Sequence, residues 1–222
     1  NIVNLLAKRA GQTKVIQYFL AKGVKPQIID QEGNTIFMNA VNANDMEMAA
    51  LFYPMIKDIN HKNNLGLSAV TMAVKSGSLE LLQYILDKGG DVNVEDNNGN
   101  NLNYYIIEAY SPRSKDVIAQ KMNLLSQKGF NHTQLSSNGN SMLYYAVATN
   151  NIGTIKKALE LDKQHINTIN EEGNAPIHKA ALLAKNTEVL QLLIQHGASK
   201  SLKTEFEETA YDLAENNDYL KQ

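Results

Sequence analysis

Residues 63–93 read NNLGLSAVTMAVKSGSLELLQYILDKGGDVN, and this stretch predicts a turn followed by two short helices. Apolar residues recur at the i, i+3, i+4 spacing of one helical face within 70–74, and again within 81–86. Ser78 is suited to cap the start of the second helix, and Gly89 to end it in the left-handed conformation.

The same pattern returns along the chain, marked by glycine. Gly33, Gly66 and Gly99 lie 33 residues apart, and Gly139 and Gly173 follow at spacings of 40 and 34. Self-similarity at this period is typical of a stack of supersecondary units. Such stacks usually bind a partner along an extended surface and seldom carry out chemistry.

Four segments carry a resemblance to a known family. Residues 30–35 (DQEGNT) and 96–100 (DNNGN) match the opening of the ankyrin repeat, 173–181 (GNAPIHKAA) matches its T-P-L-H-x-A core, and 89–93 (GGDVN) matches its ending. The chain therefore resembles ankyrin repeat proteins over nearly its whole length. The resemblance implies an all-α, ankyrin-like repeat solenoid of stacked helix pairs with short β-turn fingers.

The repeat register predicts a single ankyrin repeat domain over 1–222. Its units are expected near 1–29, 30–62, 63–95, 96–135, 136–169 and 170–203, with a closing half-unit at 204–222. The first helix pair lacks its leading turn. It could be a terminal cap or could follow further repeats, and the sequence leaves both open.

The fourth unit departs most from the pattern. It has seven extra residues around 110–116 (YSPRSKD), and Pro112 disfavours a helix at Ser111. We expect a protruding loop between the two helices of this unit. Such a loop could carry recognition, through Tyr110 and Arg113, or could be a tolerated insertion.

Composition excludes several classes of function. The net charge is −2, no block of five like charges occurs, and no apolar run approaches 18 residues. We expect neither nucleic-acid binding nor membrane insertion. The chain has no cysteine, 19 lysines and 2 arginines, which suggests a bacterial source but leaves periplasm, secretion and cytoplasm open.

Motifs for catalysis or metal binding are missing from the sequence. An EF-hand loop counted from Asp91 would need glycine and glutamate where Asp96 and Leu102 stand. The five histidines form no zinc pair. We expect His178 to be structural, as in the family, and the others to be solvated. No phosphate-binding glycine loop or nucleophile elbow occurs. We therefore expect no metal, no cofactor and no enzymatic activity.

The resemblance also suggests where a partner would bind. In this family the concave face consists of turn tips and the first helix of each unit. The register places an exposed stripe at Asn39, Met72, Tyr105, Tyr145 and Lys179, and on the same face Asn42, Ala43, Lys75, Ser76, Glu108, Ala109, Ala148, Thr149, Leu182 and Leu183. Met72, Tyr105 and Tyr145 form either an exposed ladder or a filling between repeats.

The sequence therefore predicts a monomeric protein–protein interaction module that binds an unknown protein on its concave surface. Its candidate contact residues are Met72, Tyr105, Glu108, Tyr110, Arg113, Tyr145, Thr149 and Lys179. One alternative is the recognition arm of a larger secreted or effector protein with an enzymatic domain elsewhere. Another is a protein that binds a metal or a small molecule.

Overall fold

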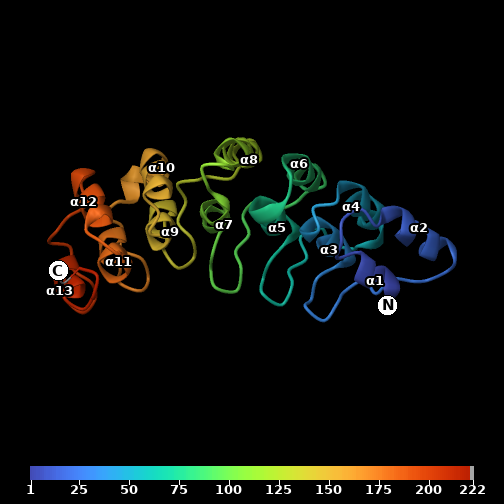
Figure 1. Ribbon diagram of the computed structural model, residues 1–222, viewed down its shortest axis with the longest axis horizontal. Coiled ribbons are helices and arrows are strands. Elements are labelled where there is room, and N and C mark those ends of the chain that lie inside the picture. Colours follow the sequence, from blue (N-terminus) through green and yellow to red (C-terminus); the bar gives the residue numbers. More distant parts are fainter. Residues whose placement is uncertain (221–222) are drawn as a thin grey trace. The chain divides into compact units, whose positions relative to one another are not determined.

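The computed structural model describes residues 1–220 of the chain (Figure 1). Those residues form helices joined by turns and contain no named strand. Two isolated bridges, Ile29 with Thr35 and Lys203 with Thr209, close fingers in which the chain folds back on itself. The predicted all-α repeat fold with short β-turn fingers is confirmed.

Contacts divide the chain into two compact units. Unit 1 comprises residues 1–98 and 116–130, and unit 2 comprises 99–115 and the residues from 131 onward. The helices of unit 1 are α1 (Ile2–Leu6), α2 (Thr13–Ala21), α3 (Ile36–Asn42), α4 (Met46–Phe52), α5 (Ala69–Ser76), α6 (Leu79–Asp87) and α8 (Lys115–Gln127, except its first residue). The helices of unit 2 are α7 (Leu102–Ala109), α9 (Met142–Ala148), α10 (Ile152–Asp162), α11 (Pro176–Leu183), α12 (Glu188–Gln195) and α13 (Ala210–Ala214). A single domain over 1–222 stays a prediction.

Several helices occur in pairs of one inner and one outer helix. Inner helix α3 packs on outer helix α4, α5 on α6, α9 on α10 and α11 on α12. Within the first of these pairs Phe37 and Phe52 are fully buried. Burying one such side chain stabilises the fold by roughly 1.5–3 kcal/mol, so packing between helices rather than helix propensity holds these short elements.

Local sequence fixes where the inner helices begin. The hydroxyl oxygens of Thr35, Ser68 and Ser141 each accept a hydrogen bond from the backbone N–H three residues later. Each of these residues precedes the first residue of its helix, the position where a hydroxyl satisfies an otherwise unpaired N–H.

The glycines that define the register, Gly33, Gly66, Gly99, Gly139 and Gly173, all have positive φ, between 69° and 79°.

Two histidines tie neighbouring segments together. His178 Nδ1 accepts from the Ala175 N–H at 3.0 Å, and its Nε2 donates to the Leu202 carbonyl at 2.9 Å. This side chain is fully buried, in agreement with a structural role. The other four histidines, His61, His132, His165 and His196, were expected to be solvated, but each is half-buried and bonded; His61 Nε2, for example, donates to the Gly33 carbonyl oxygen at 2.8 Å.

The insertion in the fourth repeat is a shorter loop than the sequence predicts. Residues 110–114 connect α7 to α8, but Lys115 and Asp116 already belong to α8, which has 13 residues against nine in α6. The Ser114 hydroxyl donates to the Ala109 carbonyl at 2.8 Å. This bond joins the two ends of the loop, which ends at Ser114, and the extra residues that follow lengthen α8.

Candidate functional site

Three inner helices of unit 2 lie in a row. Helix α7 packs against α9, and α9 packs against α11, while α10 and α12 lie on the other side of that row (Figure 1). The side chains that point away from α10 and α12 are the candidates for contact with a partner.

Tyrosines join the first two helices of this row. The Tyr104 ring lies 5.1 Å from the Tyr105 ring and 5.3 Å from the Tyr145 ring, centroid to centroid, and both pairs are edge-on. Edge-to-face geometry at this distance is favourable beyond simple burial. Tyr105 and Tyr145 are only 5% and 6% exposed, whereas Tyr104 is half-buried.

A lysine extends this network to the third helix. Lys179 of α11 places its Nζ 5.4 Å from the centre of the Tyr144 ring on α9. Burial raises the pKa of the Tyr144 phenol, and the negative charge of Glu172 raises it further. The phenol is therefore neutral at physiological pH, and the ring offers its face to the lysine cation.

Of the two alternatives that the sequence left open for Met72, Tyr105 and Tyr145, the exposed ladder is wrong. Tyr105 and Tyr145 fill the space between adjacent inner helices, and Met72, on α5 of unit 1, is 8% exposed. Asn39 of α3 is buried as well, with Nδ2 bonded to Asp30 at 3.0 Å. All four residues are therefore buried, and for Tyr105 and Tyr145 the alternative of a filling between repeats describes them.

Accessible side chains lie about one helical turn further along the inner helices, in the loop after α7 and, at Lys179, within the stripe itself. In unit 2, Glu108, Arg113 and Thr149 are exposed, and Tyr110 and Lys179 are half-buried. Leu182 and Leu183 near the end of α11 are each 44% exposed. We call these seven residues the inner face of unit 2.

The sequence did not single out Tyr104 and Tyr144 as supports for this face. Both align with His178, at the position that is histidine in the family. Two aromatic residues in succession on adjacent repeats, 104–105 and 144–145, are the signal that could have revealed stacking.

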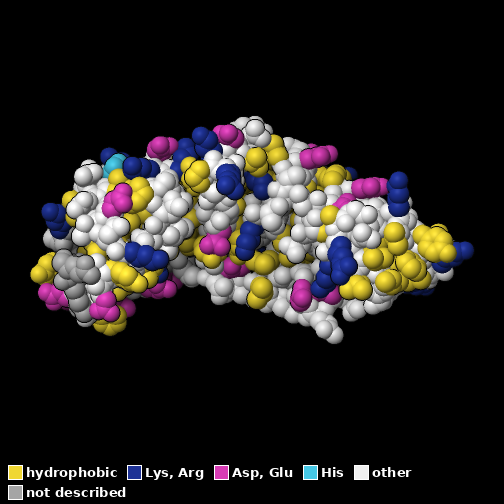
Figure 2. Space-filling model, in the orientation of Figure 1, with side chains coloured by type: hydrophobic (Ala, Val, Ile, Leu, Met, Phe, Trp, Pro, Cys, Tyr) yellow, Lys and Arg dark blue, Asp and Glu magenta, His cyan; other side chains and the backbone are white. Residues whose placement is uncertain are grey.

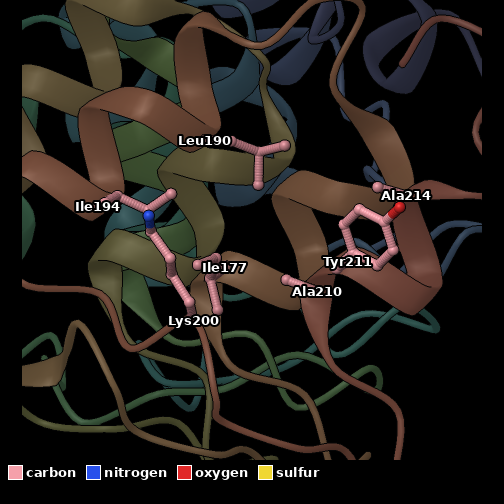
Figure 3. Close-up of a pocket in the computed structure, with 7 residues that line it drawn as sticks. All are labelled: Ile177, Leu190, Ile194, Lys200, Ala210, Tyr211 and Ala214. Carbon is pink, nitrogen blue, oxygen red and sulfur yellow. The ribbon is translucent and has the colours of Figure 1, made fainter. Parts of the chain in front are cut away.

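A pocket of about 260 Å³ lies elsewhere in unit 2, among α11, α12 and α13. Figure 3 shows Ile177, Ile194 and the stem of Lys200 on one side of it, and Tyr211 and Ala214 on the other. Leu190 and Ala210 complete the lining, which is mostly apolar. Nothing in the sequence pattern had marked this pocket.

Hydrophobic side chains also gather over α1 and α2 in unit 1 (Figure 2). Ile2, Leu5, Val15 and Tyr18 are between 40% and 59% exposed there. Their helices pair with each other, and α2 also contacts α4.

Within residues 1–220, no cluster of three His, Cys, Asp or Glu side chains is placed to hold a metal ion. In the same residues, no helix is both long and apolar enough to cross a membrane.

The relatives found by comparison with known proteins are themselves ankyrin repeat proteins. The chain is 24% identical over 182 residues to the ankyrin repeat protein YahD of Escherichia coli (strain K12), covering 80% of this chain and 87% of that protein. An ankyrin repeat protein of Rickettsia bellii (strain RML369-C) is 23% identical over 111 residues, which cover 49% of this chain and 61% of that protein.

Solved structures show the same fold. The human ASB11 ankyrin repeat domain matches with a TM-score of 0.72 and 21% identity, covering 100% of this chain and 95% of that one. A chain from the complex of the predatory endopeptidase Bd0816 of Bdellovibrio bacteriovorus with the immunity protein Bd3460 matches with a TM-score of 0.62 and 22% identity, covering 87% and 96%.

The family model for ankyrin repeats, which describes three copies, matches residues 4–96 and 113–204. Ankyrin repeats are protein–protein interaction modules and are in general not catalytic. Since these matches span most of its length, the chain belongs to the ankyrin repeat family.

Proposed function

We propose that this protein binds a protein partner on the inner face of unit 2, the face that is concave in its family. One observation carries the proposal: exposed and half-buried side chains of mixed character stand on three adjacent helices and in the loop after α7, and tyrosines pack between those helices. A rigid support lowers the entropy lost when a surface side chain is ordered by a partner.

The chemistry of this face suits a partner surface with both polar and apolar groups. Glu108 and Arg113 offer opposite charges, Tyr110 offers an aromatic ring with a hydroxyl, and Leu182 and Leu183 offer apolar area. Tyrosine and arginine are the residue types that most often dominate interface energy. Tyr105 and Tyr145 support the surface from below in this proposal, and neither they nor Met72 of unit 1 contact the partner.

The proposal includes no turnover, cofactor or metal, and treats the protein as a monomer. Its mechanism is surface complementarity. The alternative, the recognition arm of a larger secreted or effector protein, uses the same face and differs only in what that arm is attached to. The similar chain from an endopeptidase–immunity protein complex supports an enzyme as one kind of partner to look for.

Cross-linking in extracts of the source organism tests the proposal. The inner-face variant Glu108→Lys with Leu183→Glu should lose a partner that the wild type captures. The matched variant Lys156→Glu with Glu160→Lys, on the outer helix α10, should keep it. Loss by the outer variant alone, or equal capture by all three proteins, would show that the inner face is not the binding surface.

A further inference from the structure

We propose that Tyr53 and Tyr84 of unit 1 form a binding site for a trimethylammonium group, and that Lys88 occupies this site until such a ligand displaces it. The site lies in a different unit from the inner face and does not depend on the function proposed for that face. Its argument rests on a cation that the structure already places against two aromatic rings.

The two rings come from separate outer segments of unit 1. Tyr84 lies in α6, and Tyr53 begins the 3₁₀ helix Tyr53–Met55 that follows α4. Their ring centroids are 6.0 Å apart and their planes are at 81°, so the rings form two adjoining walls. The Lys88 Nζ lies 5.1 Å from the centre of the Tyr53 ring and 5.5 Å from that of the Tyr84 ring. Both distances are within the range of cation–π attraction, about 6 Å.

The core of unit 1 supports both walls. The fully buried ring of Phe37 meets the Tyr53 ring edge-on, at 6.0 Å between centroids. Tyr84 precedes Ile85, which is fully buried in the same helix. Burial raises the pKa of the Tyr84 phenol, and Tyr53 raises it further, so the phenol is neutral at physiological pH. Walls that are set in advance lower the entropy lost when a ligand binds.

No hydrogen bond from its ammonium group holds Lys88 in this site. The side chain is exposed, and within residues 1–220 its Nζ donates to no acceptor. The carboxylate of the preceding residue, Asp87, accepts instead from Gln83 and Lys128, each at 2.8 Å. Tyr53 and Tyr84 are themselves only half-buried. A ligand that prefers the rings can therefore replace Lys88 without breaking a hydrogen bond of its ammonium group.

The chemistry of the site favours a quaternary ammonium over lysine. The ammonium group of lysine is strongly hydrated and gains by keeping its N–H donors in water. A trimethylammonium group has no N–H to lose from water, and aromatic rings are the usual receptors for it in choline and in methylated lysine. Because Asp87 is paired with Lys128, that carboxylate is not left to hold a metal ion here. The rings therefore determine the ligand.

The test titrates the full chain with choline chloride and follows the tyrosine ring resonances by NMR. Sodium chloride keeps the ionic strength constant, so that screening of surface charges does not change. We expect saturable binding with a Kd of about 10 mM or below. The neutral isostere 3,3-dimethylbutan-1-ol has the same shape without the charge, and it should bind about tenfold more weakly or worse. This comparison needs no variant, so it stands even if a tyrosine substitution unfolds the chain.

Four variants connect the binding to these residues. Lys88→Gln removes the resident cation and should tighten choline binding about tenfold, whereas Lys88→Arg keeps a cation and should bind as the wild type does. Tyr84→Leu removes one wall and should weaken binding about tenfold or more. Tyr18→Leu is the matched control and should bind as the wild type does, since Tyr18 is a 59% exposed tyrosine of α2 with the Lys22 Nζ 5.7 Å from its ring.

A further titration identifies the source of the group. Tighter binding of a short glycine-flanked trimethyllysine peptide than of choline would assign it to a protein partner, and the reverse order to a small metabolite. Equal binding of choline and its neutral isostere would overturn the proposal. So would choline binding that Tyr84→Leu leaves unchanged or that Lys88→Gln fails to tighten, and so would the absence of saturable binding up to about 100 mM choline.

Discussion

Asn170 donates a hydrogen bond from Nδ2 to Oδ1 of Asn140 at 2.7 Å, across 30 residues of sequence. In unit 1, Asn63 makes the same bond to Asn34 at 2.8 Å, across 29 residues. Both bonds join the fingers of successive repeats, and Asn140 and Asn170 are buried. Because an unpaired amide is costly where water is excluded, these pairs fix how one finger lies against the next.

We expect Asn170→Asp to destabilise the protein by about 1–3 kcal/mol. The carboxylate keeps the oxygen that accepts the N–H groups of Glu172 and Asn174, but cannot donate to Asn140. Urea denaturation measures the change. Asn186→Asp is the matched control, because exposed Asn186 also accepts an N–H bond, from Glu188 at 2.9 Å. Equal stability of the two variants would mean that the bond between fingers contributes nothing.

Gly33 and Gly23 provide a second matched pair in unit 1. Both have positive φ, 78° and 84°, so alanine should cost about 1–2 kcal/mol at either. A Cβ at Gly33 would also meet the backbone nitrogen of Asn64 at 2.8 Å, whereas a Cβ at Gly23 meets nothing within 4 Å. Gly33→Ala should therefore be the more destabilising by a further 1–3 kcal/mol or so in thermal or urea unfolding. Similar losses for both would show that the fingers can move apart.

Lys121 should make stability depend on pH. Its Nζ is buried and donates to the carbonyls of Ala73 and Val74, both at 2.9 Å, and desolvation lowers its pKa from 10.5 to about 8. Between these values the unfolded chain binds a proton that the folded chain does not, so stability should rise with pH. The gain is about 2 kcal/mol between pH 7 and pH 9.5.

Comparison with Lys121→Met isolates this effect, because other groups titrate over the same range. As the pH rises, the stability of the wild type should increase relative to that of Lys121→Met. It should not increase relative to that of Lys75→Met, a variant that removes an exposed lysine of α5. Parallel pH profiles for wild type and Lys121→Met would contradict the lowered pKa.

Tyr105→Ala and Tyr145→Ala should each cost about 3–5 kcal/mol of stability, as large aromatic truncations in cores do. Both rings are buried and meet the Tyr104 ring edge-on. Tyr211→Ala, at a 73% exposed position, should change stability by less than about 0.5 kcal/mol. Thermal melts of the three variants decide the matter. If the melting temperatures of the first two variants were close to that of the wild type, these two tyrosines would be exposed and not part of the core.

The residues of this chain should show no turnover in a broad hydrolase screen. No nucleophile elbow, zinc-binding histidine pair or phosphate-binding glycine loop occurs in the sequence. Activity that copurifies with the protein and disappears with a single substitution in it would contradict this prediction.

The sequence by itself determined the repeat. The glycine period set the turns, Thr35, Ser68 and Ser141 set the starts of inner helices, and the apolar spacing set which residues face the core. These signals are local: a positive φ, a cap and a helical face each depend on a few neighbouring residues, so they can be read without knowing what lies across from them.

Only the tertiary structure decided what covers each face. Tyr105 and Tyr145 lie on a helical stripe that the family pattern would leave accessible, yet the adjacent inner helices of unit 2 enclose them. Tyr211 holds a place that is buried in other repeats and yet is exposed, because α13 packs on α11 but is paired with no outer helix in residues 1–220. The exposure of a side chain depends on which segments, distant in the sequence, lie against it. The periodicity within one helix carries no information about those segments.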